Sequence, residues 1–218
     1  MSTGQADTSP RTATHVFGPG DAMRRSLRNA ALGAMFVLSA LSSERTAYAH
    51  QPVVFEAGKV LPIEDPILSF AVYGEFKDPR DVFEATMLLT RPLAVPVEVL
   101  VPRRDGLDNH RPIFAIVGAG LPEPTAGERA LLPRPLPPGA GVIIGAGGET
   151  DREVIFESFT RRIFWTNGVT AYVLPAGQVS IWVFSPGGTL GKFVLGFGVE
   201  EGSQDLGYIL SNWGDFAY

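Results

Sequence analysis

The chain has 218 residues, no cysteine and a formal net charge of −5, with 23 acidic against 18 basic side chains. Without cysteine it forms neither a disulfide nor a thiolate metal site. The acidic balance and the lack of a long basic run argue against nucleic acid and against anionic membrane surfaces as partners.

An export signal is predicted at residues 23–49. The basic stretch Met23–Arg28 is followed by the apolar run Ala30–Leu41 and then by the small-x-small sequence Ala47-Tyr48-Ala49. This order is typical of a secretory signal peptide that is cleaved after Ala49. We therefore expect a mature chain that begins at His50 and works in the periplasm or outside the cell.

The apolar run is too short for a membrane anchor, because a helix needs about 20 residues to cross the hydrocarbon core. No other segment of the mature chain is long and apolar enough. The Arg24-Arg25 pair is compatible with twin-arginine export, and the general secretory route stays open as the alternative. Residues 1–22 are polar and are either a disordered extension or the result of a start assigned too early, with Met23 as the true start.

The mature chain is predicted to be all-β. Proline and glycine recur every few residues and separate short runs rich in Val, Ile, Phe, Trp and Tyr. The predicted strands cover 52–56, 68–75, 81–90, 94–101, 113–117, 141–144, 153–157, 163–165, 169–174, 178–184 and 191–199. About ten short strands within 50–199 are typical of a single β-sandwich or jelly roll.

Three local patterns refine this prediction. Ile181–Phe184 is apolar throughout, which indicates a strand covered on both faces. Pro96 lacks an amide donor, so its strand is expected at a sheet edge or with a bulge. Asn167-Gly168 between two apolar runs predicts a β-hairpin.

Two segments fall outside the strand pattern. Residues 118–141 are rich in proline and glycine, and they are expected to form a surface loop or strap without a regular element. The middle of this segment, Pro133–Pro138, is expected to be extended polyproline that acts either as a connection or as a docking ligand. The tail, 200–218, is predicted to be a final strand or short helix packed on the sandwich, or an exposed docking segment.

The run Leu174–Phe184, followed by Gly187-Gly188 and Lys192–Phe197, resembles the last hairpin of a bacterial pre-peptidase C-terminal-type domain. Asp81–Ala85 resembles the strand that opens such domains. The resemblance covers roughly 70–102 and 165–199. It implies a secreted, jelly-roll-like sandwich that serves as an accessory module and not as a catalyst.

A copper site is a second hypothesis. After cleavage the chain would hold two histidines, His50 at its N-terminus and His110. A free N-terminal histidine offers its amine and a ring nitrogen to one ion, and nitrogen ligands suit Cu(II). His50 and His110 are therefore the candidate metal ligands.

Weaker signals come from acidic side chains. Glu64-Asp65, Asp78 with Asp81 and Asp105 with Asp108 are paired acids in expected loops, which is a setting for Ca²⁺. A hydrolase would use two paired carboxylates, and the candidates for such a pair are Glu153 with Glu157 or Glu200 with Glu201.

The predicted function is an exported, non-catalytic accessory or binding module of the cell envelope. Its partner is an envelope protein or a glycan, since an exposed subset of the aromatic side chains between Phe156 and Phe197 would stack on sugar rings. The alternative is a periplasmic copper-binding protein, and a secreted hydrolase is third.

Overall fold

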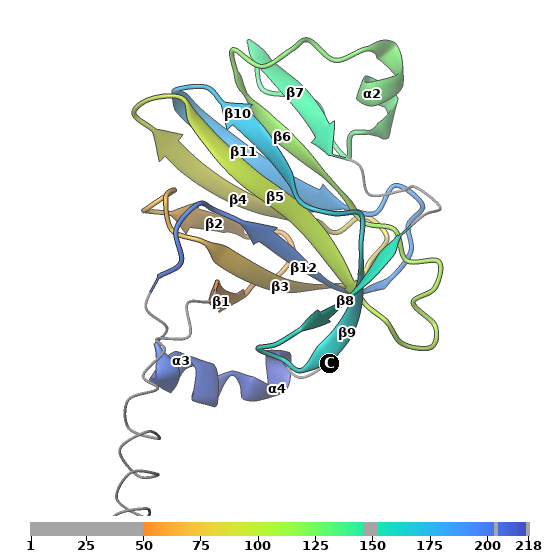
Figure 1. Cartoon of the computed structure of the whole chain (residues 1–218). Helices are drawn as coiled ribbons and strands as arrows, with labels where there is room; N and C mark the ends of the chain where they lie inside the picture. Colours follow the sequence, from red (N-terminus) through yellow and green to blue (C-terminus); the bar gives the residue numbers. More distant parts are fainter. Residues whose placement is uncertain (1–49, 146–151, 203–204, 217–218) are drawn as a thin grey trace, which may run out of the picture. The chain divides into compact units, whose positions relative to one another are not determined.

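Two mixed β-sheets pack face to face in the computed structural model, which describes residues 50–145, 152–202 and 205–216 (Figure 1). The predicted all-β sandwich is confirmed. The expected extension 1–22 and the expected signal peptide 23–49 lie outside the described residues.

The larger sheet has seven strands, and all its neighbours are antiparallel except β1 and β3. In pairing order the strands are β1 (Gln51–Val54), β3 (Phe70–Phe76), β12 (Gly191–Phe197), β5 (Leu93–Pro102), β9 (Arg162–Thr166) and β8 (Glu153–Glu157), with β10 (Thr170–Leu174) also paired to β5.

The smaller sheet has five strands, of which β2 and β4 are parallel. In order they are β2 (Val60–Ile63), β4 (Val82–Leu89), β11 (Gly177–Phe184), β6 (Ile113–Ala119) and β7 (Ala140–Gly145). The sequence did not predict β2, because it is short and contains Pro62. Its position at the edge of the sheet tolerates a proline.

The main core lies between the sheets and is rich in aromatic rings. Phe76, Phe83 and Phe193 pack with ring centroids 4.8 to 5.1 Å apart. Val179, Ile181 and other apolar side chains from both sheets complete it. This core holds the two layers together through the hydrophobic effect.

The outer face of the smaller sheet is also apolar and is covered by the strap. Trp182 and Phe184 are buried there with Leu132 and Leu136 of the strap against them. The guanidinium of Arg134 lies 4.2 Å from the centre of the Trp182 ring and pairs with a carboxylate of β4. The prediction of a strand covered on both faces is therefore confirmed.

The expectation that 118–141 contains no regular element is wrong. A short helix, α2 (Ala126–Leu131), begins after Thr125, whose side chain accepts from the backbone N–H of Glu128. Glu128 in turn accepts from the backbone N–H of Thr125, which completes a capping box. The N–H groups of Thr125 and Glu128 are both hydrogen-bonded in this way, which stabilises a helix that is too short to form by helix propensity alone.

The outer face of the larger sheet is covered by the tail, which forms α3 (Leu206–Ser211) and α4 (Trp213–Phe216) (Figure 1). Phe216 is completely buried, and its ring packs edge-on against Tyr73 of β3 at 4.9 Å. Of the predicted alternatives for the tail, a short helix packed back on the sandwich is the one that the structure shows.

The predicted hairpin at Asn167-Gly168 is wrong. The strands on either side, β9 and β10, do not pair with each other; both pair with the same edge of β5. Gly168 has φ +85° and donates its N–H to the hydroxyl of Thr166. The dipeptide is therefore a break that inserts one extra residue into a continuing strand, like a β-bulge.

Two further expectations need correction. Pro96 lies in β5, which is an inner strand and not an edge strand. Its carbonyl accepts from the N–H of Gly198, which follows the last residue of β12. The position that lacks an N–H therefore lies just past the end of β12, where no strand needs that donor. The last hairpin implied by the resemblance is absent: β11 belongs to the smaller sheet and β12 to the larger one. The glycine turn between them crosses from one sheet to the other.

Within the part of the chain that the structure describes, no helix has the length and hydrophobicity needed to cross a membrane.

Replacing Phe216 by alanine tests how much the tail contributes to stability. The Phe216→Ala variant removes a fully buried ring, and we expect the free energy of unfolding to fall by about 3–5 kcal/mol in urea titrations. Leu210→Ala, on the exposed side of the same tail, is the control and should change it by less than about 0.5 kcal/mol. Equal effects would show that the tail does not pack on the sheet.

Candidate functional site

A hollow of about 270 Å³ lies on the outer face of the larger sheet. Its floor consists of residues on β3, β12 and β5, among them Ala71 and Gly196. One wall is the end of the β8–β9 hairpin, residues 155–159. His50 and Glu201, which precede β1 and follow β12, also line it.

Short side chains make the floor deep. A Cβ atom added at Gly196 would lie 3.0 Å from Cγ of Glu98 on the neighbouring strand. The glycine therefore leaves the space that the Glu98 side chain occupies. Ala71 fills little of the volume beside it.

Glu98 is the polar centre of the hollow. Its carboxyl group is partly buried, and Thr166 donates a long hydrogen bond of 3.4 Å to it. Burial raises the pKa of Glu98, and the charge of His50 and the Thr166 hydroxyl offset only part of that effect. The hollow thus contains an incompletely solvated carboxyl group.

The described residues that line the hollow include three carboxylates, Glu98, Glu157 and Glu201, but no lysine or arginine. Glu157 stabilises the hairpin turn, because its carboxylate accepts hydrogen bonds from the backbone N–H groups of Phe159 and Thr160 at 2.6 and 2.7 Å. These bonds shape the turn of the hairpin. Glu98 and Glu201 lie on other segments, β5 and the residues after β12.

Tyr73 forms part of the apolar wall. Burial, followed by the charge of Glu157, raises the pKa of its phenol, so it stays neutral. Its ring packs on Phe216, and Phe216 lies 5.8 Å from the ring of Phe159 in the hairpin turn. The tail helices and the hairpin therefore support the hollow together.

A larger hollow of about 740 Å³ follows the strap. Its charged groups pair with each other or with the sheet: Arg129 with Glu123, and Arg134 with Glu84. We therefore regard the hollow around Glu98 as the better candidate site.

The structure does not bring the two predicted copper ligands together. Nδ1 of His50 forms a hydrogen bond with Ser69, just before β3, whereas the ring of His110 packs on Phe76, the last residue of β3. The seven residues of β3 rise about 3.3 Å each, so its two ends lie about 20 Å apart. A single ion cannot contact both rings across that distance.

His110 is an interior residue that is only 1% exposed. Its Nδ1 lies 3.0 Å from the hydroxyl of Thr189, which in turn bonds to the hydroxyl of Ser185. Nε2 has no hydrogen-bond partner among the described residues. Burial, together with the nearby charge of Arg152, lowers the pKa of His110 to about 4.

Acids from two of the three pairs considered for calcium are used within their turns. Asp81 accepts from the backbone N–H groups of Lys77 and Asp78, and Asp78 pairs with Arg80. Asp65 accepts from the N–H of Ile67. In residues 50–145, 152–202 and 205–216, no three or more His, Asp or Glu side chains gather as a metal site would require.

Of each pair of acids considered for hydrolysis, one member, Glu157 or Glu201, lines the hollow and the other does not. Glu153 and Glu157 occupy the two ends of β8, about 13 Å apart along the strand. Glu201 lines the hollow, but the backbone of Glu200 bridges to Leu68.

Sequence patterns do not mark Glu98 and Gly196, which meet in the hollow, as parts of one site. Glu98 stands in the alternating run Val95–Val99, which marks it as facing away from the valines. Gly196 interrupts a strand of large apolar residues, a signal for close approach of another group. Neither signal says that the two residues meet.

No family model matches the chain, and no match was found among curated proteins. Among solved structures, the chain is similar to the pre-peptidase C-terminal domain of a collagenase from Bacillus anthracis, with 7% sequence identity and a TM-score of 0.35. The match covers 68% of this chain and 96% of that domain. It is the type of domain that the two sequence segments resemble, and at this level of likeness we base no functional conclusion on it.

Acid should destabilise the fold through His110. Its pKa is about 4 when folded against an ordinary value of 6.5, so the unfolded chain binds the proton more readily. The resulting stability is complete above pH 6.5 and is lost as the pH falls towards 4. Between pH 8 and pH 5 we expect His110 to account for a loss of about 2 kcal/mol in the free energy of unfolding.

Urea unfolding of the native chain and of the variants His110→Gln and His50→Gln at both pH values measures this contribution. The loss should shrink in His110→Gln and persist in His50→Gln. An NMR titration that gives His110 a pKa of 6.5 or higher would contradict the expectation.

Proposed function

We propose that this chain is an exported, non-catalytic binding module of the cell envelope, with the hollow around Glu98 as its ligand site. The observation that carries the proposal is the partly buried Glu98 carboxyl at the centre of a preformed, largely apolar hollow. Binding sites commonly combine apolar walls with a few placed polar groups.

The arrangement favours binding over catalysis. Glu98 is accompanied by Glu157, which is held by the hairpin turn, and by Glu201 from the segment after β12. Of the two histidines, His50 lines the hollow with its Nδ1 hydrogen-bonded to Ser69, and His110 lies out of reach at the other end of β3. The groups that line the hollow can orient and desolvate a ligand with positive or hydroxyl groups.

Export is supported by the sequence of residues 23–49. The first strand of the sandwich, β1, begins at Gln51, close behind the expected cleavage site after Ala49. The cysteine-free composition also suits a protein whose fold relies on packing alone, since the core is built from aromatic and branched side chains.

NMR titration of the mature chain tests the proposal. The probes are soluble peptidoglycan fragments, chito-oligosaccharides and basic peptides, each added to isotope-labelled protein. We expect at least one probe to shift the resonances of Ala71, Glu98 and Gly196, and Glu98→Gln to weaken that binding roughly two- to tenfold. Glu64→Gln, the same charge change in the segment after β2, should leave binding unchanged.

Two results would contradict the proposal. One is that no probe shifts the residues of the hollow. The other is that a probe is converted into a product and that Glu98→Gln abolishes the conversion, which would identify an enzyme.

A further inference from the structure

Strand β8 forms an unprotected edge of the larger sheet. It is the last strand in the pairing order, and no strand of the described part of the chain pairs with its other side. Natural sheet edges are commonly blunted by charged side chains, above all lysine, by proline or by a bulge. The sequence of β8, Glu-Val-Ile-Phe-Glu, has a glutamate at each end but no lysine or proline.

The register shows which backbone groups are free. The carbonyl of Ile163 accepts from the first N–H after β5, so the peptide groups of Ile163 face β5. Peptide groups alternate along a strand, and those of Phe164 therefore face Ile155 of β8. The N–H and C=O groups of Val154 and Phe156 must then point to the free edge.

One face of this edge is apolar and open. The side chains of Val154 and Phe156 are 50% and 64% exposed, and Ile163, opposite Phe156 on β9, is 46% exposed. These three side chains share one face because cross-strand partners do so. The face would cover alternate apolar side chains of an added strand.

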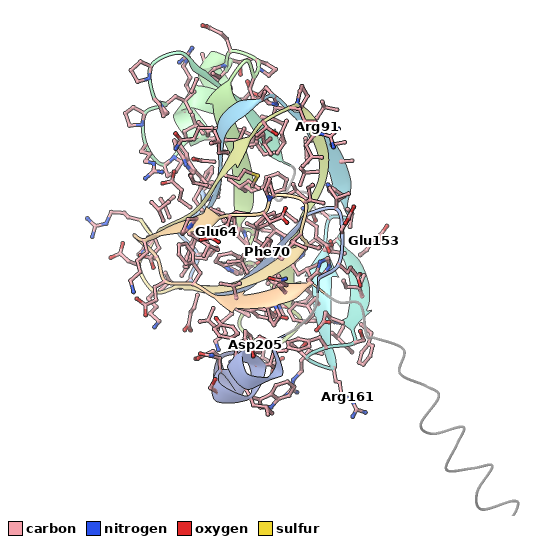
Figure 2. All side chains as sticks on the ribbon, turned by 90° about the vertical axis from the view of Figure 1, so that its left-hand side faces the viewer. Glu64, Phe70, Arg91, Glu153, Arg161 and Asp205 are labelled. Atoms are coloured by element: carbon pink, nitrogen blue, oxygen red, sulfur yellow. The ribbon has the colours of Figure 1, made fainter. Side chains whose placement is uncertain are left out.

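The other face of β8 is acidic. Glu153 and Glu157 share it with Ile155, and it adjoins the hollow with Glu98 and Glu201. Arg103, Arg104, Arg161 and Arg162 lie together near the hairpin turn and the end of β5, with Arg162 opposite Glu157 on β9. Arg152, just before β8, lies over the Trp165 ring and donates to the carbonyls of Asp108 and His110. Glu153 and Arg161 lie at opposite ends of the hairpin (Figure 2).

Charge argues against one pairing of two copies of the chain at this edge, the one centred on Ile155. Antiparallel pairing of two β8 strands about Ile155 would place Glu153 of each copy opposite Glu157 of the other. Like charges directly opposite each other destabilise a strand pair. The same acidic residues favour a strand that carries lysine or arginine.

We propose that β8 binds an extended segment of a partner protein in which apolar and basic side chains alternate, so that the segment adds a strand to the larger sheet. Its backbone pairs with Val154 and Phe156, its apolar side chains cover the exposed face, and a basic side chain on its other face meets Glu153. Strand addition of this kind combines main-chain hydrogen bonds with side-chain selection. The inference rests on the proposed function and names its ligand class.

The peptide acetyl-KVKFKVK-amide is the probe, and calorimetry with the mature chain is the measurement. Val154→Pro removes one outward N–H at an edge position where proline is tolerated, and Val154→Thr is the control that keeps it. We expect Val154→Pro to bind the peptide roughly three- to tenfold more weakly than Val154→Thr. The peptide N-methylated at alternate residues, tested on the unaltered chain, puts the same question even where Val154→Pro does not fold.

Charge is tested separately. Glu153→Gln should weaken binding about two- to fivefold, and Glu64→Gln in the segment after β2 should have no effect (Figure 2). Equal binding by Val154→Pro and Val154→Thr, together with equal binding of the N-methylated peptide, would overturn strand addition. A dimer in sedimentation that Val154→Pro dissolves would assign the edge to a second copy instead.

The two proposals can fail independently. If saccharides shift the hollow and the peptide does not bind, the proposed function stands and the inference about its ligand falls. If no probe of any class binds at the hollow or at β8, both fall.

Discussion

The central strands of both sheets are apolar on both faces, and a two-layer sandwich can bury only one of them. Ile181 and Val183 of β11 lie in the core between the sheets, while Trp182 and Phe184 point outward. If this outer surface were exposed to water, the fold would lose about 25 cal/mol of stability for each Å² of exposed apolar area. Each sheet therefore needs an outer cover, and the chain provides one at both faces.

The two covers differ, and the difference locates the candidate site. On the smaller sheet the strap lies over Trp182 and ties its arginine to β4. On the larger sheet the cover is shared by the tail helices and the hairpin turn, which meet at Phe159 and Phe216. The hollow around Glu98 remains beside this shared cover, where Ala71 and Gly196 of the sheet below leave space between larger side chains.

Local patterns predicted most of the strands, and they predicted that β11 is covered on both faces. This worked because the alternation of apolar and polar side chains along a strand reflects which of its faces are buried. Pairing is not local. Asn167-Gly168 has the chemistry of a hairpin turn, but the open edge of β5 accommodates both flanking strands and turns the dipeptide into a break. The capping box at Thr125 and Glu128 was readable in the sequence, yet the surrounding prolines outweighed it. His50 and His110 show the limit of composition, since two side chains that suit one ion were placed at opposite ends of a strand.

The order of strands has a consequence for how the chain assembles. β11 and β12, the last two strands in the sequence, occupy the centre of their respective sheets. β12 joins β3 to β5, and β11 joins β4 to β6, so neither sheet can close before the end of the chain is present. Contacts between such distant segments make folding slow. The strands β1 to β10 therefore lack their central partners until β11 and β12 have been synthesised, so both sheets are completed late.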